Sequence, residues 1–203
     1  MPTKIAIIQY SLYGHVTGLS NSIKKGVEET GAKCDIYQVP ELLSEEILGK
    51  MSAPPKPDFP IITAEKMKEY DGFIFGLSGR FGTMPAQMKS FMDSTGSLWQ
   101  SGALVGKAAG TFTSVGTQGG GQETVNLSMI PYITHMGMVF VPLGYVEPKV
   151  FSYDEVHGAS PYGSGTFAGP DGSRSPSELE LSIGEAHGKH FATIASKLSM
   201  IDA

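Results

Sequence analysis

The sequence contains almost no cysteine and no long hydrophobic run. Cys34 is the only cysteine among 203 residues, so neither an intramolecular disulfide nor a cysteine-based metal site can form. The N-terminal segment MPTKIAIIQY is apolar only over the length of a strand, which is too short for a signal peptide or a membrane span. We therefore expect a cytoplasmic protein with no transmembrane segment, and peripheral attachment to a membrane surface stays open.

Clustered basic charge is also absent. The formal net charge is -5 at pH 7, and no run of Lys or Arg exceeds two residues. Binding of nucleic acid requires a basic face, so we expect no nucleic-acid partner. The composition, 40% hydrophobic and 17% charged, is that of an ordinary globular protein, and the length fits a single domain covering residues 1–203.

Short apolar segments alternate with amphipathic ones along the chain. The expected strands are residues 5–9, 34–39, 72–76, 110–114 and 138–142. After the first of them, Val16, Leu19, Ile23 and Val27 recur at spacings of 3, 4 and 4, which is the period of a helix face. This alternation predicts an α/β three-layer sandwich, with helices on both faces of a parallel sheet. Five strands fit the flavodoxin-like order 2-1-3-4-5.

The C-terminal third carries a long loop and a final helix. Residues 143–173 are rich in glycine and proline, and a loop of this length usually has a function or covers another part of the protein. The final helix is expected to begin with a capping box of Ser175 and Glu178, with Pro176 in its first turn. Its expected inner face consists of Leu179, Ile183, Ala186, His190, Ile194 and Leu198.

The three loops that follow strands one, three and four are the richest in Gly, Ser and Thr. In a sheet of this order, ligands bind at the carboxyl ends of the strands, near the switch between strands one and three. The first loop, SLYGHVTG at 11–18, joins a strand to a helix N-terminus, which attracts a phosphate. An ordinary N-cap by Ser11 or Thr17 is an equally good explanation of this loop.

The second and third loops have compositions that suit a planar, polar-edged ligand. In residues 79–84, Phe81 offers an apolar face, Arg80 offers a cation with directional donors, and Gly82 allows close backbone approach. In residues 113–123, three consecutive glycines allow an anion-binding nest of backbone N–H groups. The alternatives are a surface arginine with a phenylalanine at the edge of the core, and a purely structural glycine loop.

Together these segments resemble the WrbA family, flavodoxin-like FMN-dependent NAD(P)H:quinone oxidoreductases. The resemblance runs from about Lys4 to Leu198. It rests on YSLYGHV, GRFGTM, GSLWQSGAL, SVGTQGGGQE, THMGM, PLGYV, SPYG and AGPDGSRSPSELELSIGEAHG. The chain departs from the family pattern at Gly79 and Val115, which replace threonines, and at Gln118, which is an additional residue.

The resemblance implies a ping-pong reaction in which NADH or NADPH reduces FMN and a quinone then takes two electrons. It implies a homotetramer (a dimer of dimers) and, as a hypothesis, protection against oxidative stress. The implied FMN-binding residues are Ser11, Leu12, Tyr13, Gly14, His15, Val16, Thr17, Gly79, Arg80, Phe81, Gly82, Ser114, Val115, Gly116, Thr117, Gln118, Gly119 and His135. Tyr13 and Trp99 are the implied substrate contacts, with Trp99 reaching a neighbouring subunit's site.

His135 is the implied catalytic residue, because a histidine beside a flavin can bond a quinone oxygen or relay a proton. An equally good explanation is a helix C-terminal histidine favoured by the helix dipole. His157, His187 and His190 are expected to be structural or exposed, and no pair of histidines indicates a metal site. Two other functions stay open: a flavodoxin-type electron carrier, and a non-catalytic FMN-binding scaffold at a membrane surface.

Overall fold

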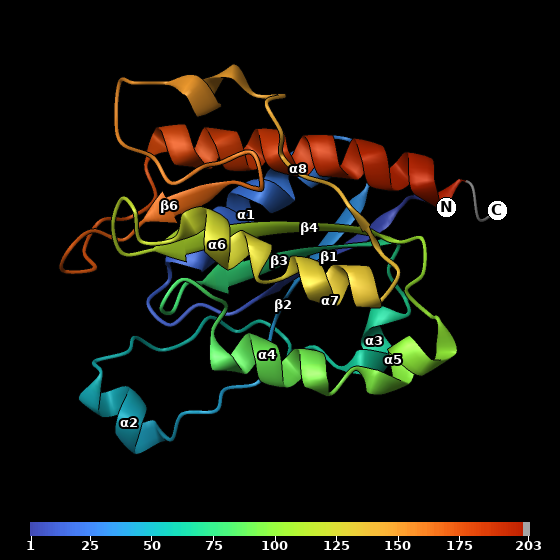
Figure 1. Ribbon diagram of the computed structural model, residues 1–203, viewed down its shortest axis with the longest axis horizontal. Helices are drawn as coiled ribbons and strands as arrows, with labels where there is room; N and C mark the ends of the chain where they lie inside the picture. Colours follow the sequence, from blue (N-terminus) through green and yellow to red (C-terminus); the bar gives the residue numbers. More distant parts are fainter. Residues whose placement is uncertain (201–203) are drawn as a thin grey trace.

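A parallel sheet forms the centre of the protein, which is described here by a computed structural model covering residues 1–200 (Figure 1). Its order is β2-β1-β3-β4-β5, and β6 also pairs with β4. All of these pairings are parallel, which confirms the expected flavodoxin-like order. The strands are β1 (Lys4–Gln9), β2 (Lys33–Gln38), β3 (Gly72–Ser78), β4 (Ala108–Val115), β5 (Val139–Phe140) and β6 (Gly165–Phe167).

The edge of the sheet beside β4 is shared by two short strands. β5 pairs with Ala108 and Ala109 at the start of β4, and β6 pairs with Thr113 to Val115 at its end. Since β3 pairs along the other side of β4, both short strands lie on the same edge. The chain between them leaves the sheet and returns, and it includes a 3-10 helix, η1 (Pro148–Phe151). The expected strand at 138–142 is therefore shorter, and the long loop contains an unpredicted strand.

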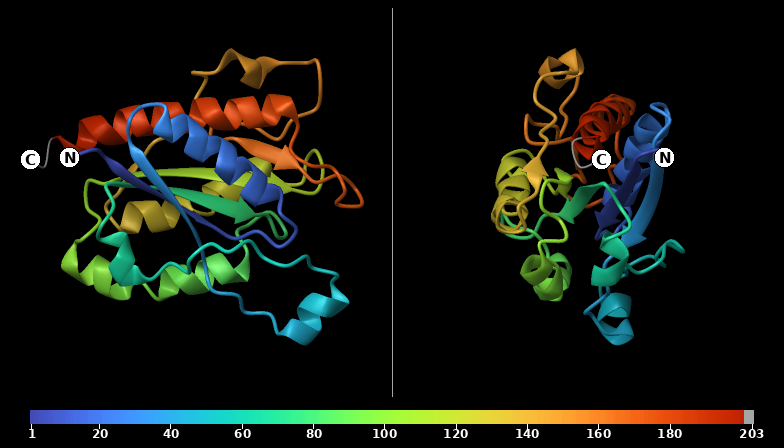
Figure 2. Two further views of the ribbon diagram at one scale, coloured as in Figure 1. Left: turned by 180° about the vertical axis from the view of Figure 1, so that it is seen from behind. Right: turned by 90° about the vertical axis from the view of Figure 1, so that its right-hand side faces the viewer.

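Helices cover both faces of the sheet. α1 (His15–Glu28) and α8 (Glu178–Ser199) lie together on one side, as Figure 1 shows. The other side carries α3 (Ala64–Met67), α4 (Ala86–Asp93), α5 (Gly96–Ser101), α6 (Gln122–Leu127) and α7 (Ile130–His135). α2 (Glu45–Lys50) stands away from the body of the protein (Figure 2). The three-layer sandwich expected from the sequence is confirmed.

Each face of the sheet packs against its own apolar core. The expected face of α1, which is Val16, Leu19, Ile23 and Val27, is fully buried in the core beneath α1 and α8. The core on the opposite face contains apolar side chains from each of the helices α3 to α7, among them Met67, Met88, Leu98, Val125 and Ile133. The two cores together fix the sheet, and with it the positions of the loops at its carboxyl edge.

The start and the inner face of α8 differ from the sequence-based expectation. The N-cap is Ser177, whose capping-box partner is Glu180, so the predicted box of Ser175 and Glu178 is wrong by two residues. Of the predicted inner face only Ile183 is buried. The face that packs on α1 and the sheet contains Gly184, His187, Gly188, Phe191, Ala192 and Ala195. Small residues mark this contact because α1 and α8 approach closely: a Cβ on Gly188 would lie 2.0 Å from the carbonyl oxygen of Ile23.

No helix within residues 1–200 is both long enough and apolar enough to cross a membrane. The single domain predicted over residues 1–203 extends three residues beyond the described part of the chain, and it stays a prediction.

Candidate functional site

A cavity of about 190 Å³ lies at the carboxyl edge of the sheet, where the three predicted loops meet. It is lined by Ser11, Leu12, Tyr13, His15, Val16, Ser78, Gly79, Arg80, Ser114, Val115, Gly116, Ala168, Gly169 and Gly172. Ten of these are predicted site residues, drawn from all three loops. A wider and more open groove of about 550 Å³ lies between Gln118, Gly119 and the segment 152–157. It contains no residue of the first or second loop.

The first loop leaves the N-terminus of α1 open toward the cavity. Gly14 is the N-cap residue, with φ of +92°, and no side chain caps the first turn. The Ser11 hydroxyl instead accepts a 3.1 Å hydrogen bond from the backbone N–H of Gly14 itself, which shapes the turn before the helix. An ordinary N-cap by Ser11 or Thr17 is therefore wrong. The uncapped N–H groups and the helix dipole together suit an anion.

A turn from the distant C-terminal region closes the first loop. Nε2 of His15 lies 3.0 Å from the carbonyl oxygen of Gly172. A carbonyl can only accept, so Nε2 carries the hydrogen and donates it. Ala168, Gly169 and Gly172 thereby become part of the cavity wall. Sequence reasoning missed these residues, although the segment GPDG at 169–172 is a recognisable turn.

The second loop presents an aromatic ring at the rim of the cavity. The backbones of Arg80 and Thr83 pair in both directions at 2.9 and 3.0 Å, which fixes a tight turn. Within this turn Phe81 has a φ of +50°, a left-handed conformation that is rare outside glycine. Its side chain is fully exposed, so the alternative of a phenylalanine at the edge of the core is wrong. Arg80 lines the cavity, and its Nη1 donates to the carbonyl of Gly79 at 2.9 Å.

The third loop contacts the second loop through a glycine. Gly121 is the N-cap of α6 and has a φ of +94°. A Cβ at this position would lie 3.0 Å from the Cα of Gly82, so the two loops can meet only with glycine here. Gly116 lines the cavity, whereas Gln118 and Gly119 line the wider groove.

Nine predicted residues lie outside the cavity wall formed by this chain. They are Gly14, Thr17, Phe81, Gly82, Trp99, Thr117, Gln118, Gly119 and His135. Gly14, Phe81 and Gly82 belong to loops that frame the cavity. His135 is the exposed last residue of α7, and Trp99 is a largely exposed residue of α5. Within one chain, neither His135 nor Trp99 reaches the cavity.

A partly buried polar cluster forms around Tyr10, the residue that precedes the first loop. The hydroxyl of Tyr10 donates to Glu41 at 3.0 Å, and the amide of Gln87 donates to both at 2.9 and 2.8 Å. Lys56 pairs with Glu41 and lies over the Tyr10 ring, 4.4 Å from its centroid. Burial alone would raise the pKa of Glu41, but hydrogen bonds from Lys56, Gln87 and the following backbone lower it to about 2. Burial and the neighbouring Glu41 raise the pKa of Tyr10.

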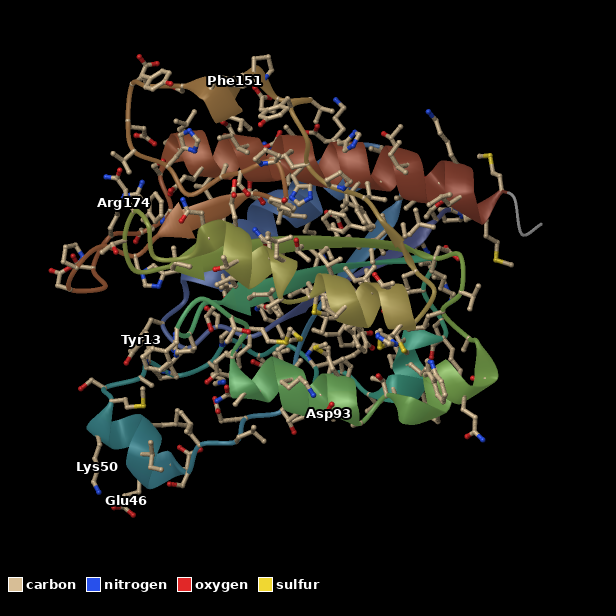
Figure 3. The ribbon with its side chains drawn as sticks, in the orientation of Figure 1. Tyr13, Glu46, Lys50, Asp93, Phe151 and Arg174 are labelled. Atoms are coloured by element: carbon tan, nitrogen blue, oxygen red, sulfur yellow. The ribbon has the colours of Figure 1, made fainter. Side chains whose placement is uncertain are left out.

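The same cluster anchors residues 42–56, called here the α2 segment, next to the site. Glu41 and Lys56 lie on either side of α2 in the sequence, and the Tyr13 hydroxyl donates to the carbonyl of Met51 at 3.2 Å. Figure 3 shows Tyr13 between the body of the protein and α2, at the same end as Arg174. The α2 segment is thus anchored at its base and at Tyr13.

The histidines outside the predicted site are of two kinds. His187 is fully buried, and its Nδ1 faces the Ser164 hydroxyl at 3.1 Å. Burial lowers its pKa to about 3, with a smaller contribution from His190. His157 and His190 are half-buried. Among residues 1–200, no three His, Cys, Asp or Glu side chains gather as metal ligands would.

Comparison with known proteins gives a family and a fold. A family model described as NADPH-dependent FMN reductase matches residues 3–149. The chain is 52% identical to "Quinone-oxidoreductase QR2" of Triphysaria versicolor over 100% of both sequences. It is 50% identical to "NAD(P)H quinone oxidoreductase PST3" of Candida albicans, covering 97% of this chain and 100% of the other.

Solved structures support the same fold. A flavodoxin, WrbA-like protein from Agrobacterium tumefaciens superposes with a TM-score of 0.67 at 19% sequence identity, covering 96% of this chain and 98% of the other. Flavodoxin 1 from Bacillus cereus superposes with a TM-score of 0.59 at 18% identity, covering 94% and 98%. At this level of identity the likeness concerns the fold alone.

Proposed function

The chain belongs to the NADPH-dependent FMN reductase family, and on this premise we propose that it is an FMN-dependent NAD(P)H:quinone oxidoreductase. The observation that carries the proposal is the uncapped N-terminus of α1, which opens into a cavity at the β1/β3 switch point. Two relatives that are named quinone oxidoreductases support the reaction class, because they are about 50% identical to this chain and match it over their whole length.

The residues of the cavity fit FMN. The first turn of α1 and the loop from Ser11 to His15 would hold the phosphate. Arg80 and Phe81 would hold the polar edge and the face of the ring, and Gly116 would let the third loop approach it. Bound FMN supplies the hydride chemistry that no side chain provides. The protein's own part is to bind, to orient the partners and to exclude water.

We further propose that Trp99 and His135 act at this site in an assembly of several chains. Trp99, His135 and Phe81 are exposed in the isolated chain, and two of them lie away from the cavity. We propose a homotetramer, a dimer of dimers, in which Trp99 of one chain and Tyr13 of another contact the quinone. His135 would then bond a quinone oxygen or relay a proton. Multi-angle light scattering of the purified protein tests the assembly.

We assign a single domain over residues 1–203, a cytoplasmic location, and protection against oxidative stress through two-electron reduction of quinones. The dispersed charge of the chain supports the absence of a nucleic-acid partner.

A flavin titration tests the cofactor. Apoprotein is titrated with FMN, riboflavin and FAD while flavin fluorescence is followed. Saturable quenching by FMN, much weaker with riboflavin, is expected because the site reads a phosphate. Binding of no flavin would reject the cofactor and the mechanism together.

Steady-state kinetics test the reaction. NADH or NADPH oxidation by the FMN-loaded protein should depend on added benzoquinone and show the parallel-line pattern of ping-pong kinetics. A one-electron carrier or a non-catalytic scaffold would show no quinone-dependent turnover, which separates these functions from the reductase.

A further inference from the structure

Three neighbouring strands, β1, β3 and β4, carry a polar side chain at or next to their last residue, on the same face of the sheet. A Cβ on Gly76 would lie 2.8 Å from Val16 of α1, so this position of β3 faces α1. Side chains alternate along a strand, and Ser78, two residues later, therefore points the same way. Its register partner on β4 is Ser114. On β1, Gln9 faces α1 as well, because it bonds Thr17 and Ser20 of that helix.

Gln9 and Ser78 differ in how their polar atoms are satisfied. Gln9 is buried, and both of its polar atoms have partners: Nε2 donates to the Thr17 hydroxyl at 3.2 Å, and Oε1 accepts from the Ser20 hydroxyl at 2.7 Å. Ser78 is 9% exposed, and its buried Oγ has no hydrogen-bond partner. A buried hydroxyl without a partner costs free energy and is rare in native proteins. The Ser78 hydroxyl is therefore free to bond a ligand bound in the cavity.

The surroundings of Ser78 indicate what its missing partner is. Ser78 lines the cavity together with Ser11, His15 and Val16, which surround the N-terminus of α1. That terminus has no side-chain cap, so its N–H groups also lack protein partners. A ligand with several acceptor oxygens can satisfy both, and the helix dipole favours one that is an anion. A phosphate monoester has this chemistry.

We propose that Ser78 is a phosphate-reading residue of the cofactor site, whose hydroxyl donates to the phosphate held at the N-terminus of α1. The assignment deepens the proposed function and rests on it for the identity of the ligand, FMN. It makes Ser78 a determinant of specificity for FMN over riboflavin. Bound phosphate would complete the hydrogen bonding of the Ser78 hydroxyl.

The test compares Ser78→Ala with a matched buried serine outside the cavity. The matched variant is Ser164→Ala, because the Ser164 hydroxyl already bonds His187 at 3.1 Å. Both variants and the wild type are titrated with FMN and with riboflavin, and the thermal midpoint of each apoprotein is measured. The rise in that midpoint with added inorganic phosphate is measured as well.

For Ser78→Ala we expect the Kd of FMN to rise about 10-fold or more, because a hydrogen bond to a charged group is lost. The Kd of riboflavin should stay within about twofold, since riboflavin has no phosphate to contact. The apoprotein should be at least as stable as the wild type, and the stabilisation by inorganic phosphate should shrink. In Ser164→Ala we expect a lower thermal midpoint of the apoprotein and an unchanged ratio of the FMN Kd to the riboflavin Kd.

Three results would overturn the assignment. If the ratio of the FMN Kd to the riboflavin Kd were unchanged in Ser78→Ala, Ser78 would not contact the phosphate. If the affinities for both flavins fell equally, Ser78 would contact the ribityl chain or the ring instead. A destabilised apoprotein would show that Ser78 has a structural partner. Failure of the proposed function is distinguishable: the wild type would then bind no flavin, while Ser78→Ala would still lose the stabilisation by inorganic phosphate.

Discussion

Val115 leaves no room for a side chain at Gly79, because a Cβ placed on Gly79 would lie 2.7 Å from Cγ1 of Val115. The same Cβ would lie 2.9 Å from Cγ2 of Val125. Gly79 and Val115 are also two positions at which the chain departs from the WrbA-family pattern, where both are threonine. A side chain at position 79 would therefore collide with both Val115 and Val125 in this fold.

We predict that Gly79→Ala lowers the free energy of unfolding by about 1–3 kcal/mol, because it overpacks this contact. The penalty should shrink in a Val115→Ala background, with a coupling energy of about 0.5 kcal/mol or more. Urea denaturation of the four proteins measures the cycle. Gly116→Ala is the control, since a Cβ there meets nothing within 4 Å. Strict additivity would mean that the two sites are independent.

The buried His187 should make stability depend on pH. Its pKa in the folded protein is about 3, below the value of about 6.5 of an unfolded histidine. The unfolded state therefore binds the proton more strongly. The contribution of His187 is fully present above pH 6.5 and is lost as the pH falls toward 3, at up to about 1.4 kcal/mol per pH unit.

His187→Asn should flatten this dependence, because asparagine keeps an acceptor near Ser164 but does not titrate. Urea midpoints between pH 4 and pH 8 measure both proteins. His190, whose pKa is also lowered by burial, is present in both and serves as an internal control. Equal slopes for the wild type and the variant would assign the dependence to other groups.

Glu180 joins three distant segments through one carboxylate. Its Oε2 accepts from Arg174 at 2.8 Å and from Thr166 at 2.7 Å, and its Oε1 accepts from the backbone of Gly158 at 3.0 Å. We predict that Glu180→Gln destabilises the protein by about 3–5 kcal/mol, because Arg174 loses its buried partner. The 168–172 turn beside His15 should loosen as well, which would weaken FMN binding.

Glu185→Gln on the same helix is the matched control. Its ion pair with Lys25 is exposed, so the loss should be about 1 kcal/mol or less. Chemical denaturation and FMN titration are run on both variants. Similar losses in the two variants would show that burial of the Glu180 pair is unimportant.

Glu41 should control the anchoring of the α2 segment. Its folded pKa of about 2 lies below the ordinary 4.5, so its stabilisation is present above pH 4.5 and is lost as the pH falls toward 2. We predict that Glu41→Gln speeds amide exchange in residues 42–56 at pH 7, because Lys56 and Tyr10 lose a charged partner. Hydrogen exchange with mass spectrometry measures this.

Glu46→Gln is the control for that experiment, because its pair with Lys50 is exposed at the tip of α2 (Figure 3). Exchange in the segment should be nearly unchanged in this variant. If Glu41→Gln also left exchange unchanged, the contact of Tyr13 with Met51 would be sufficient to anchor the segment.

The sequence by itself determined the layers of the fold and the region of the site. Strands of continuous apolar residues and the 3, 4 and 4 spacing on α1 reflect burial that every α/β sandwich of this order requires. The loops that leave β1, β3 and β4 must meet at one edge, because the carboxyl ends of parallel strands do. Local pattern is sufficient for these features.

Tertiary contacts decided what local pattern left ambiguous. The segment SPSELE contains two capping boxes, Ser175 with Glu178 and Ser177 with Glu180. The second is used because Glu180 meets Arg174 and Thr166 in the core. β6, with three residues, is too short to show a period and exists only because β4 has a free edge. Ser78 likewise looks like any strand-end serine until the fold places it, with its hydroxyl buried and unpartnered, in the wall of the cavity onto which α1 opens.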